Sequence, residues 1–168
     1  MRVGDGHLTY CTNIHPGESW EAIRANLGRH LPAVKRRVSP DAAFGVGLRL
    51  SAEAARALRE PDAVHEFEQF LRAEDLYVFT VNGFPYGPFH GTRVKEDVYL
   101  PDWRDEARLE YTNQLAGLLA RWSPTGDAAY GSVSTVPGSR NACAATAERR
   151  RPTPKGASGE TRRFTSGR

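Results

Sequence analysis

The chain has little cysteine and no long hydrophobic run. Its 168 residues include two cysteines, Cys11 and Cys143, with no CxxC spacing and no neighbouring set of metal-ligand residues. This pattern favours neither a zinc site nor a disulfide framework, and we expect Cys11 to be a small buried side chain. No stretch approaches the ~18 uninterrupted apolar residues of a membrane span, and residues 1–7 lack the apolar core of a secretory signal. These absences predict a cytoplasmic protein without a membrane segment.

Positive charge is scarce outside the C-terminal end of the chain. The whole sequence has 23 Lys and Arg and 20 Asp and Glu, a formal net charge of +3. Residues 139–168 hold eight of the basic and two of the acidic residues, which leaves fifteen and eighteen for residues 1–138. A basic excess commonly indicates a nucleic-acid partner. Here the excess lies in one terminal segment, so we do not expect the rest of the chain to bind nucleic acid.

The same terminal segment has almost no large apolar side chains. Phe164 is the single one in residues 139–168, and such a segment cannot offset a backbone ordering cost of about 1–2 kcal/mol per residue. We therefore divide the chain into a folded domain, residues 1–138, and a basic, low-complexity, disordered tail, residues 139–168. Two origins of the tail stay open. We favour a reading-frame shift or gene truncation in GC-rich DNA over an appended arm that binds nucleic acid.

Strand-like and helix-like segments alternate along residues 1–138. A two-residue alternation of bulky with small or polar side chains predicts strands at residues 8–15, 44–50, 76–82 and 131–136. Apolar residues spaced by three and four predict three intervening helices, at residues 20–38, at 52–71 with a restart at Pro61, and at 102–122. Ser19 and Ser51 are the expected N-caps.

Two of the expected helices raise further points. Pro32 lies inside the first helix, where it either produces a kink or begins a second short helix. In the last helix we expect the buried stripe to consist of Leu109, Thr112, Leu115, Leu119 and Trp122.

Strands joined by helices are expected to be parallel and to follow one another in sequence order. In the first two strands one face is aliphatic and the other carries small or polar residues such as Gly45, Gly47 and Arg49. That difference favours a (β/α) barrel with external helices over an open sheet covered on both faces. A full barrel needs eight strands, so the expected fold is α/β, a partial TIM barrel of about four parallel strands. The side chains expected to pack against the helices are Leu8, Tyr10, Ile14, Phe44, Val46, Leu48, Tyr77, Phe79 and Val81.

Four sequence segments carry a family resemblance. They are residues 8–20 (LTYCTNIHPGESW), 44–51 (FGVGLRLS), 78–87 (VFTVNGFPYG) and 132–138 (SVSTVPG). Together they resemble the N-terminal half of the EboE family of metabolite traffic proteins, which belongs to the xylose-isomerase-like TIM barrels, relatives of sugar-phosphate isomerases and epimerases. The resemblance covers residues 7–138. It implies a truncated protein, because the family's barrel has a second half that nothing after Gly138 resembles.

Candidate site residues follow from the barrel geometry, because active sites lie at the C-terminal ends of the strands. The titratable imidazoles His15 and His90 are the catalytic candidates. The candidates for substrate binding are Asn13, Arg49, Asn82, Phe84, Tyr86 and Ser134, with Thr135 as the alternative to Ser134.

Structural alternatives stay open for several of these residues. His15 can bond a turn carbonyl, Arg49 can pair with an acidic residue of the next loop, Asn82 with Gly83 can form a turn, and His90 can anchor its loop.

The resemblance implies a divalent metal in full-length relatives, with ligands mainly from later strands. No Asp or Glu ends any of the four predicted strands, so we expect no complete metal site and leave the cofactor unknown. The enzyme hypothesis is an isomerase or epimerase that moves a proton next to a carbonyl of a small polar or anionic metabolite. The alternatives are a non-catalytic metabolite-binding protein and a nucleic-acid-binding protein that uses the tail. Open sheet edges also predict self-association.

Overall fold

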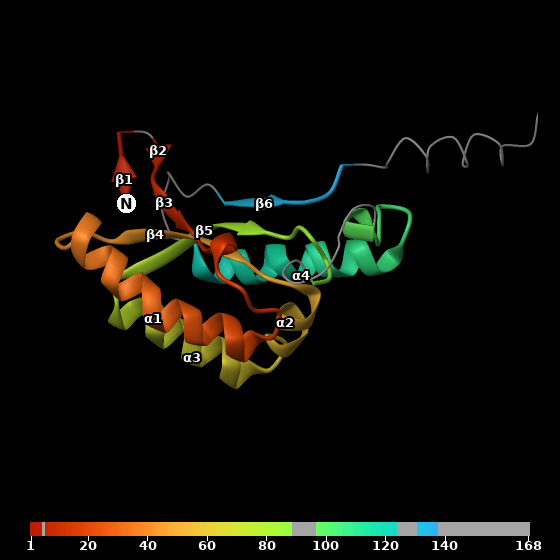
Figure 1. Cartoon of the computed structure of the whole chain (residues 1–168), viewed down its shortest axis with the longest axis horizontal. Coiled ribbons are helices and arrows are strands. Elements are labelled where there is room, and N and C mark those ends of the chain that lie inside the picture. The colour runs from red at the N-terminus through yellow and green to blue at the C-terminus, as the bar shows by residue number, and fades with distance from the viewer. Residues whose placement is uncertain (5, 89–96, 124–130, 138–168) are drawn as a thin grey trace, which may run out of the picture.

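A parallel sheet forms the centre of the computed structural model, which describes residues 1–4, 6–88, 97–123 and 131–137. The sheet contains β3 (Thr9–Cys11), β4 (Phe44–Arg49), β5 (Leu76–Asn82) and β6 (Ser132–Ser134). The strands lie in the order β3-β4-β5-β6, and each neighbouring pair is parallel (Figure 1). The predicted parallel, sequential order is confirmed. The described residues form an open sheet and do not close a barrel.

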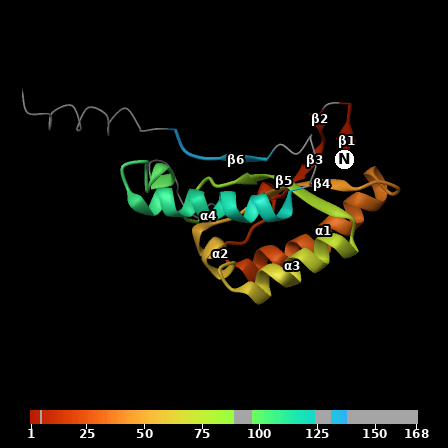
Figure 2. The ribbon, with the colours of Figure 1, turned by 180° about the vertical axis from the view of Figure 1, so that it is seen from behind.

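Helices and a short hairpin complete the described architecture. The helices are α1 (Trp20–Val38), α2 (Ala52–Ala57), α3 (Pro61–Ala73) and α4 (Glu106–Trp122), and two 3-10 turns are η1 (Thr12–Ile14) and η2 (Asp97–Tyr99). An antiparallel hairpin of β1 (Arg2–Val3) and β2 (Gly6–His7) precedes the sheet. Figures 1 and 2 show α1, α2 and α3 together on one side of the sheet, with α4 running along β5 and β6. None of the helices in the described ranges is long and apolar enough to cross a membrane.

The predicted helix starts are confirmed by their caps. The hydroxyl of Ser19 accepts a hydrogen bond from the Ala22 amide at 3.3 Å, and that of Ser51 accepts one from Ala54 at 3.0 Å. Each bond satisfies an amide that has no partner inside its helix. Pro32 lies within one α-helix that continues to Val38, so the alternative of a second short helix is wrong.

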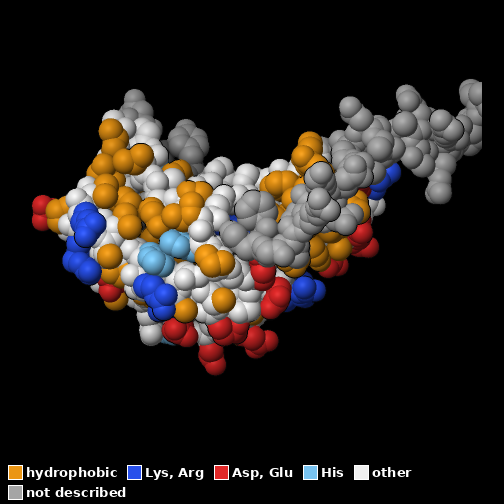
Figure 3. All heavy atoms as spheres, viewed as in Figure 1, with side chains coloured by type: hydrophobic (Ala, Val, Ile, Leu, Met, Phe, Trp, Pro, Cys, Tyr) orange, Lys and Arg blue, Asp and Glu red, His pale blue; other side chains and the backbone are white. Residues whose placement is uncertain are grey.

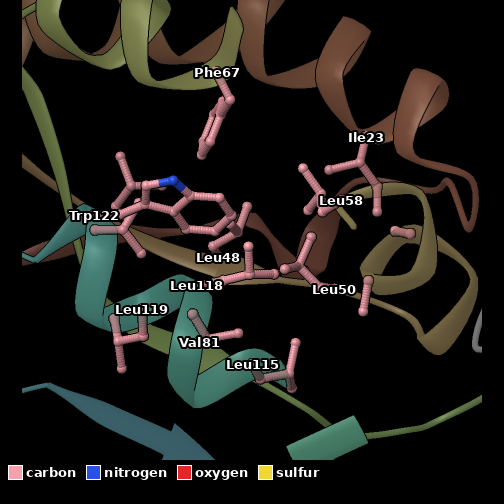
Figure 4. Packing of buried hydrophobic residues seen from close by; sticks show 14 of the residues in the cluster. Ile23, Leu48, Leu50, Leu58, Phe67, Val81, Leu115, Leu118, Leu119 and Trp122 are labelled. Carbon is pink, nitrogen blue, oxygen red and sulfur yellow. The ribbon is translucent and has the colours of Figure 1, made fainter. Parts of the chain in front are cut away.

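One hydrophobic core fills the space between the helices and one face of the sheet. Phe44, Val46, Leu48 and Val81 of the strands belong to the same buried cluster as residues of all four helices. Figure 4 shows the Trp122 indole among these side chains, and its ring meets Phe67 edge-on at 4.9 Å between centroids. Because every helix contributes to this cluster, the helices all cover the same face of the sheet.

Four of the nine side chains expected against the helices lie elsewhere. Leu8 is 51% exposed and Ile14 is 67% exposed, because the first strand ends at Cys11 and residues 12–14 form η1. Tyr77 and Phe79 lie on the opposite face of the sheet, where both rings meet that of His7.

An irregularity in β5 explains the second pair. Val46 pairs with Val78, whereas Gly47 pairs with Thr80, so Phe79 is an extra residue that shifts the alternation. Val78 and Val81 are buried as a result.

Two further expectations fail at the edges of the core. Cys11 is exposed because it ends an edge strand and points away from the helices. Leu109 is 50% exposed, although Leu115, Leu119 and Trp122 of the same predicted stripe are buried. The buried face of α4 instead consists of Arg108, Tyr111, Leu115, Leu118, Leu119 and Trp122. Cys143, His90 and the tail at residues 139–168 lie outside the described residues.

Candidate functional site

A row of polar residues crosses the C-terminal edge of the sheet. Arg49 pairs with Asn82 across β4 and β5, and Asn82 pairs with Ser134 across β5 and β6. Asn82 Oδ1 accepts hydrogen bonds from the Ser134 hydroxyl at 2.9 Å and from the Phe84 amide at 3.1 Å. Parallel strands bring their carboxyl ends to one edge, which is why residues far apart in sequence meet here. We call the row Arg49, Asn82 and Ser134 the rim; Thr135 follows it and is exposed.

Arg49 connects two loops beside the rim, the loop after β3 and the loop after β5. Its guanidinium donates to the carbonyl oxygens of Gly17 at 3.2 Å and Gly87 at 3.3 Å, and it pairs with the Glu18 carboxylate at 2.8 Å. The residue is only 3% exposed. Arg49 therefore forms an ion pair, but with Glu18 of the loop after β3 and not, as the alternative to ligand binding had it, with an acidic residue of the next loop.

His15 lies beside α1, at the end of the small pocket that it shares with Arg49. Its Nε2 lies 2.8 Å from the Tyr10 hydroxyl, and its ring stacks on that of His30 with centroids 4.1 Å apart. Figure 3 shows histidine side chains gathered on this surface. Burial, and then the nearby His30, lower the pKa of His15. The pocket is also lined by Thr12, Gly17 and Asn26.

The other predicted ligand-binding residues are spread around the loop after β5. Asn13 is partly buried, and its Oδ1 is buried without a hydrogen-bond partner in the described part of the chain. Phe84 lies against Tyr99 at 5.8 Å, whereas Tyr86 meets Tyr111 of α4 edge-on at 5.0 Å. The Tyr86 carbonyl also accepts a hydrogen bond from the Ala52 amide at 2.9 Å. Of these residues, Phe84 is joined directly to the rim, through its amide and Asn82.

Tyr86 separates two surface hollows. One, with an empty volume of about 330 Å³, is lined by residues that include Glu18, Ser51, Arg56 and Gly87. The other is wider and more open, and is lined by residues that include Leu100, Pro101, Arg104 and Glu106. The Tyr86 side chain is therefore part of the wall of both hollows.

Arg108 of α4 is a buried residue that sequence reasoning missed. It is 0% exposed, its Nε donates to the Pro101 carbonyl at 2.8 Å, and its Nη1 donates to the Gly83 carbonyl at 3.1 Å. Burial lowers its pKa. The expected stripe contained no charged residue, although Arg108 precedes Tyr111 by three residues and Leu115 by seven, a spacing that puts all three on one helical face.

A divalent metal does not fit the part of the chain that the structure describes. There, no three His, Cys, Asp or Glu side chains come together as ligands. The rim offers a cation, an amide and a hydroxyl, and the nearby Glu18 carboxylate is paired with Arg49. A hard divalent ion needs several converging oxygen ligands, so we assign no step of any reaction to a metal.

Comparison with known proteins gives no relative: no family model matches the chain, and neither curated proteins nor solved structures provide a match. The geometry of the rim and of its loops is therefore the basis for assigning a function.

Proposed function

We propose that this chain is the N-terminal half of a (β/α) barrel of the EboE type, and that its rim holds a small polar or anionic metabolite. The observation that carries the proposal is that Arg49, Asn82 and Ser134 pair across three neighbouring strands at the carboxyl edge of a parallel sheet. In α/β proteins this edge is where ligands bind, because strand ends and loops converge there. The loop after β5 supplies aromatic side chains beside the row.

The proposed chemistry is that of a sugar-phosphate isomerase or epimerase, in which a proton is moved next to a carbonyl. His15 is the candidate base: its lowered pKa keeps the ring neutral near pH 7, and a neutral imidazole nitrogen can accept a proton. Asn82 and Ser134 supply an amide and a hydroxyl that can orient the hydroxyls of a polyol.

A non-catalytic metabolite-binding protein is the second candidate, and one observation favours it. The charge of Arg49 is already neutralised by Glu18, and His15 is held by Tyr10 and His30. Groups fixed in pairs are suited to shaping a pocket, whereas a base must be able to release its partner when it takes a proton.

Proton exchange separates the two candidates. The full chain would be mixed with a panel of pentoses, hexoses and their monophosphates in D2O, with binding followed by ligand-observed NMR. An isomerase or epimerase exchanges the proton next to the carbonyl for deuterium, whereas a carrier binds without exchange. Absence of both binding and exchange across the panel would contradict the proposal.

Asn82→Asp tests the rim itself. The new carboxylate still accepts the hydrogen bonds from Ser134 and Phe84, but it adds negative charge to the row. We expect binding of a sugar monophosphate to weaken by about tenfold or more, since like charges within a few ångströms repel strongly in a partly buried site. Asn113→Asp, on the exposed side of α4, makes the same chemical change away from the rim and is the control.

A further inference from the structure

Arg108 is a buried cation without an acidic partner in the described chain. The other two buried basic side chains each have one: Arg49 lies 2.8 Å from Glu18, and Lys35 lies 3.5 Å from Asp75. Arg108 instead donates to two neutral carbonyls and lies 5.5 Å from the ring centres of both Tyr86 and Tyr111. A buried charge without a counter-charge is costly even when some of its hydrogen bonds are made.

One end of this guanidinium is also unused. Nη2 of Arg108 is buried and has no hydrogen-bond partner among the residues that the structure describes. A guanidinium has five N–H donors, so the two on Nη2 remain for an acceptor from outside the described chain. Such an acceptor would supply both the missing hydrogen bonds and the missing negative charge.

The surroundings of Arg108 indicate where an anion would approach. Its guanidinium donates to the Gly83 carbonyl, one residue after Asn82 of the rim, and lies 5.5 Å from the centre of the Tyr86 ring, which lines both hollows. Tyr86 is partly exposed, whereas Tyr111, the second ring beside Arg108, is buried in the core. Of these two rings, Tyr86 is therefore the one beside which an anion from solvent would reach Arg108.

We propose that Arg108 is the anion-binding residue of this protein, and that it takes an oxyanion, a carboxylate or phosphate group, which enters beside Tyr86. The inference rests on the proposed function in one respect: the anion is the charged part of the metabolite whose polar part lies at the rim. It assigns the binding of the anion to Arg108 and not to Arg49, because Arg49 is paired with Glu18, whereas Arg108 has no acidic partner in the described chain.

Inorganic phosphate serves as the probe, and the full chain is melted in phosphate and in sodium chloride of equal ionic strength. We expect phosphate to raise Tm by about 4–8 °C when its concentration exceeds Kd by about thirtyfold. Arg108→Met should lose this increment whatever its own Tm. Arg108→Lys keeps the charge but loses the planar fork, so it should keep a smaller increment. Arg121→Met, on the exposed side of the same helix, is the matched control and should keep the increment in full.

Two results would overturn the inference: no phosphate-specific rise in the wild-type chain, or an undiminished rise in Arg108→Met. If the Arg108 variants do not fold, the side-chain nitrogen NMR signals of Arg108 in the wild-type chain decide. A saturable shift with phosphate supports the inference, and no shift refutes it.

The two proposals fail separately. Loss of phosphate binding in Asn82→Asp but not in Arg108→Met would keep the rim as the anion site and reject Arg108. Phosphate binding at Arg108, without binding or proton exchange of any sugar, would keep the anion site and reject the metabolite function.

Discussion

The two faces of the parallel sheet are built very differently. The face toward the helices carries Phe44, Val46 and Leu48 and is fully buried in the core. The opposite face combines small or polar residues, of which Cys11 and Ser132 are exposed, with the rings of Tyr77 and Phe79, which meet His7 of the β1–β2 hairpin. Parallel sheets are normally covered on both faces. The contrast teaches that the buried core of the described chain, and with it most of the stability, lies on the helix side of the sheet.

Trp122→Ala should give the largest loss of stability, because it removes a large side chain from the core on the helix side of the sheet. Trp122 is 4% exposed and packs on Phe67. Truncating a buried tryptophan leaves a large cavity, and we expect a loss of about 3–5 kcal/mol in the free energy of unfolding, measured by urea denaturation. Trp103→Ala is the matched control: Trp103 is 39% exposed and should cost far less. Equal losses would mean that burial does not distinguish the two sites.

Arg49→Ala should come second, because Arg49 connects the rim to the loops above it. The change removes the ion pair with the Glu18 carboxylate and the two hydrogen bonds to the Gly17 and Gly87 carbonyls. Glu18 is partly exposed, so we expect about 1–3 kcal/mol, less than the loss for a fully buried pair. The double variant Arg49→Ala, Glu18→Gln should regain much of the lost free energy of unfolding. A double variant as unstable as Arg49→Ala would show that the loop contacts, and not the ion pair, matter.

The strands and helices were largely predictable from the sequence. β5 begins and ends at the predicted residues, and both serine caps form, because these features depend on residues close together in the chain. The orientation of Tyr77 and Phe79 could not be predicted. One extra residue in β5 reverses the alternation of its side chains, and the amino-acid sequence of the strand does not reveal it.

Part of the site was predictable for the same reason. Strand direction alone gives the row of Arg49, Asn82 and Ser134. The pairing of Arg49 with Glu18, the stacking of His15 on His30 and the burial of Arg108 depend on contacts between distant segments, and local patterns do not encode them.

The outer strands of the sheet predict self-association through their unpaired edges. β3 and β6 are the outer strands of the described sheet, and an unpaired edge is a template for another chain. Ser132→Lys places a charge on exposed β6 and should weaken association about tenfold or less, as followed by sedimentation velocity over a concentration series. Asn113→Lys on α4 is the control for charge alone. A wild-type chain that stays monomeric at every concentration would contradict the prediction.

The smallest expected effect concerns pH and the histidine stack beside the rim. Burial and His30 lower the pKa of His15 below its ordinary value of 6.5. The unfolded chain therefore takes up this proton more readily than the folded one, so His15's contribution is complete above about pH 6.5 and is lost as pH falls toward the folded-state pKa. Solvent screening of a partly exposed ring keeps the effect below about 1 kcal/mol. Urea denaturation at about pH 7.5 and 5.5 should show a smaller drop for His15→Phe, which cannot titrate. His65→Asn, on the exposed face of α3, controls for the loss of any histidine, and a drop unchanged in His15→Phe would mean that the stack does not sense pH.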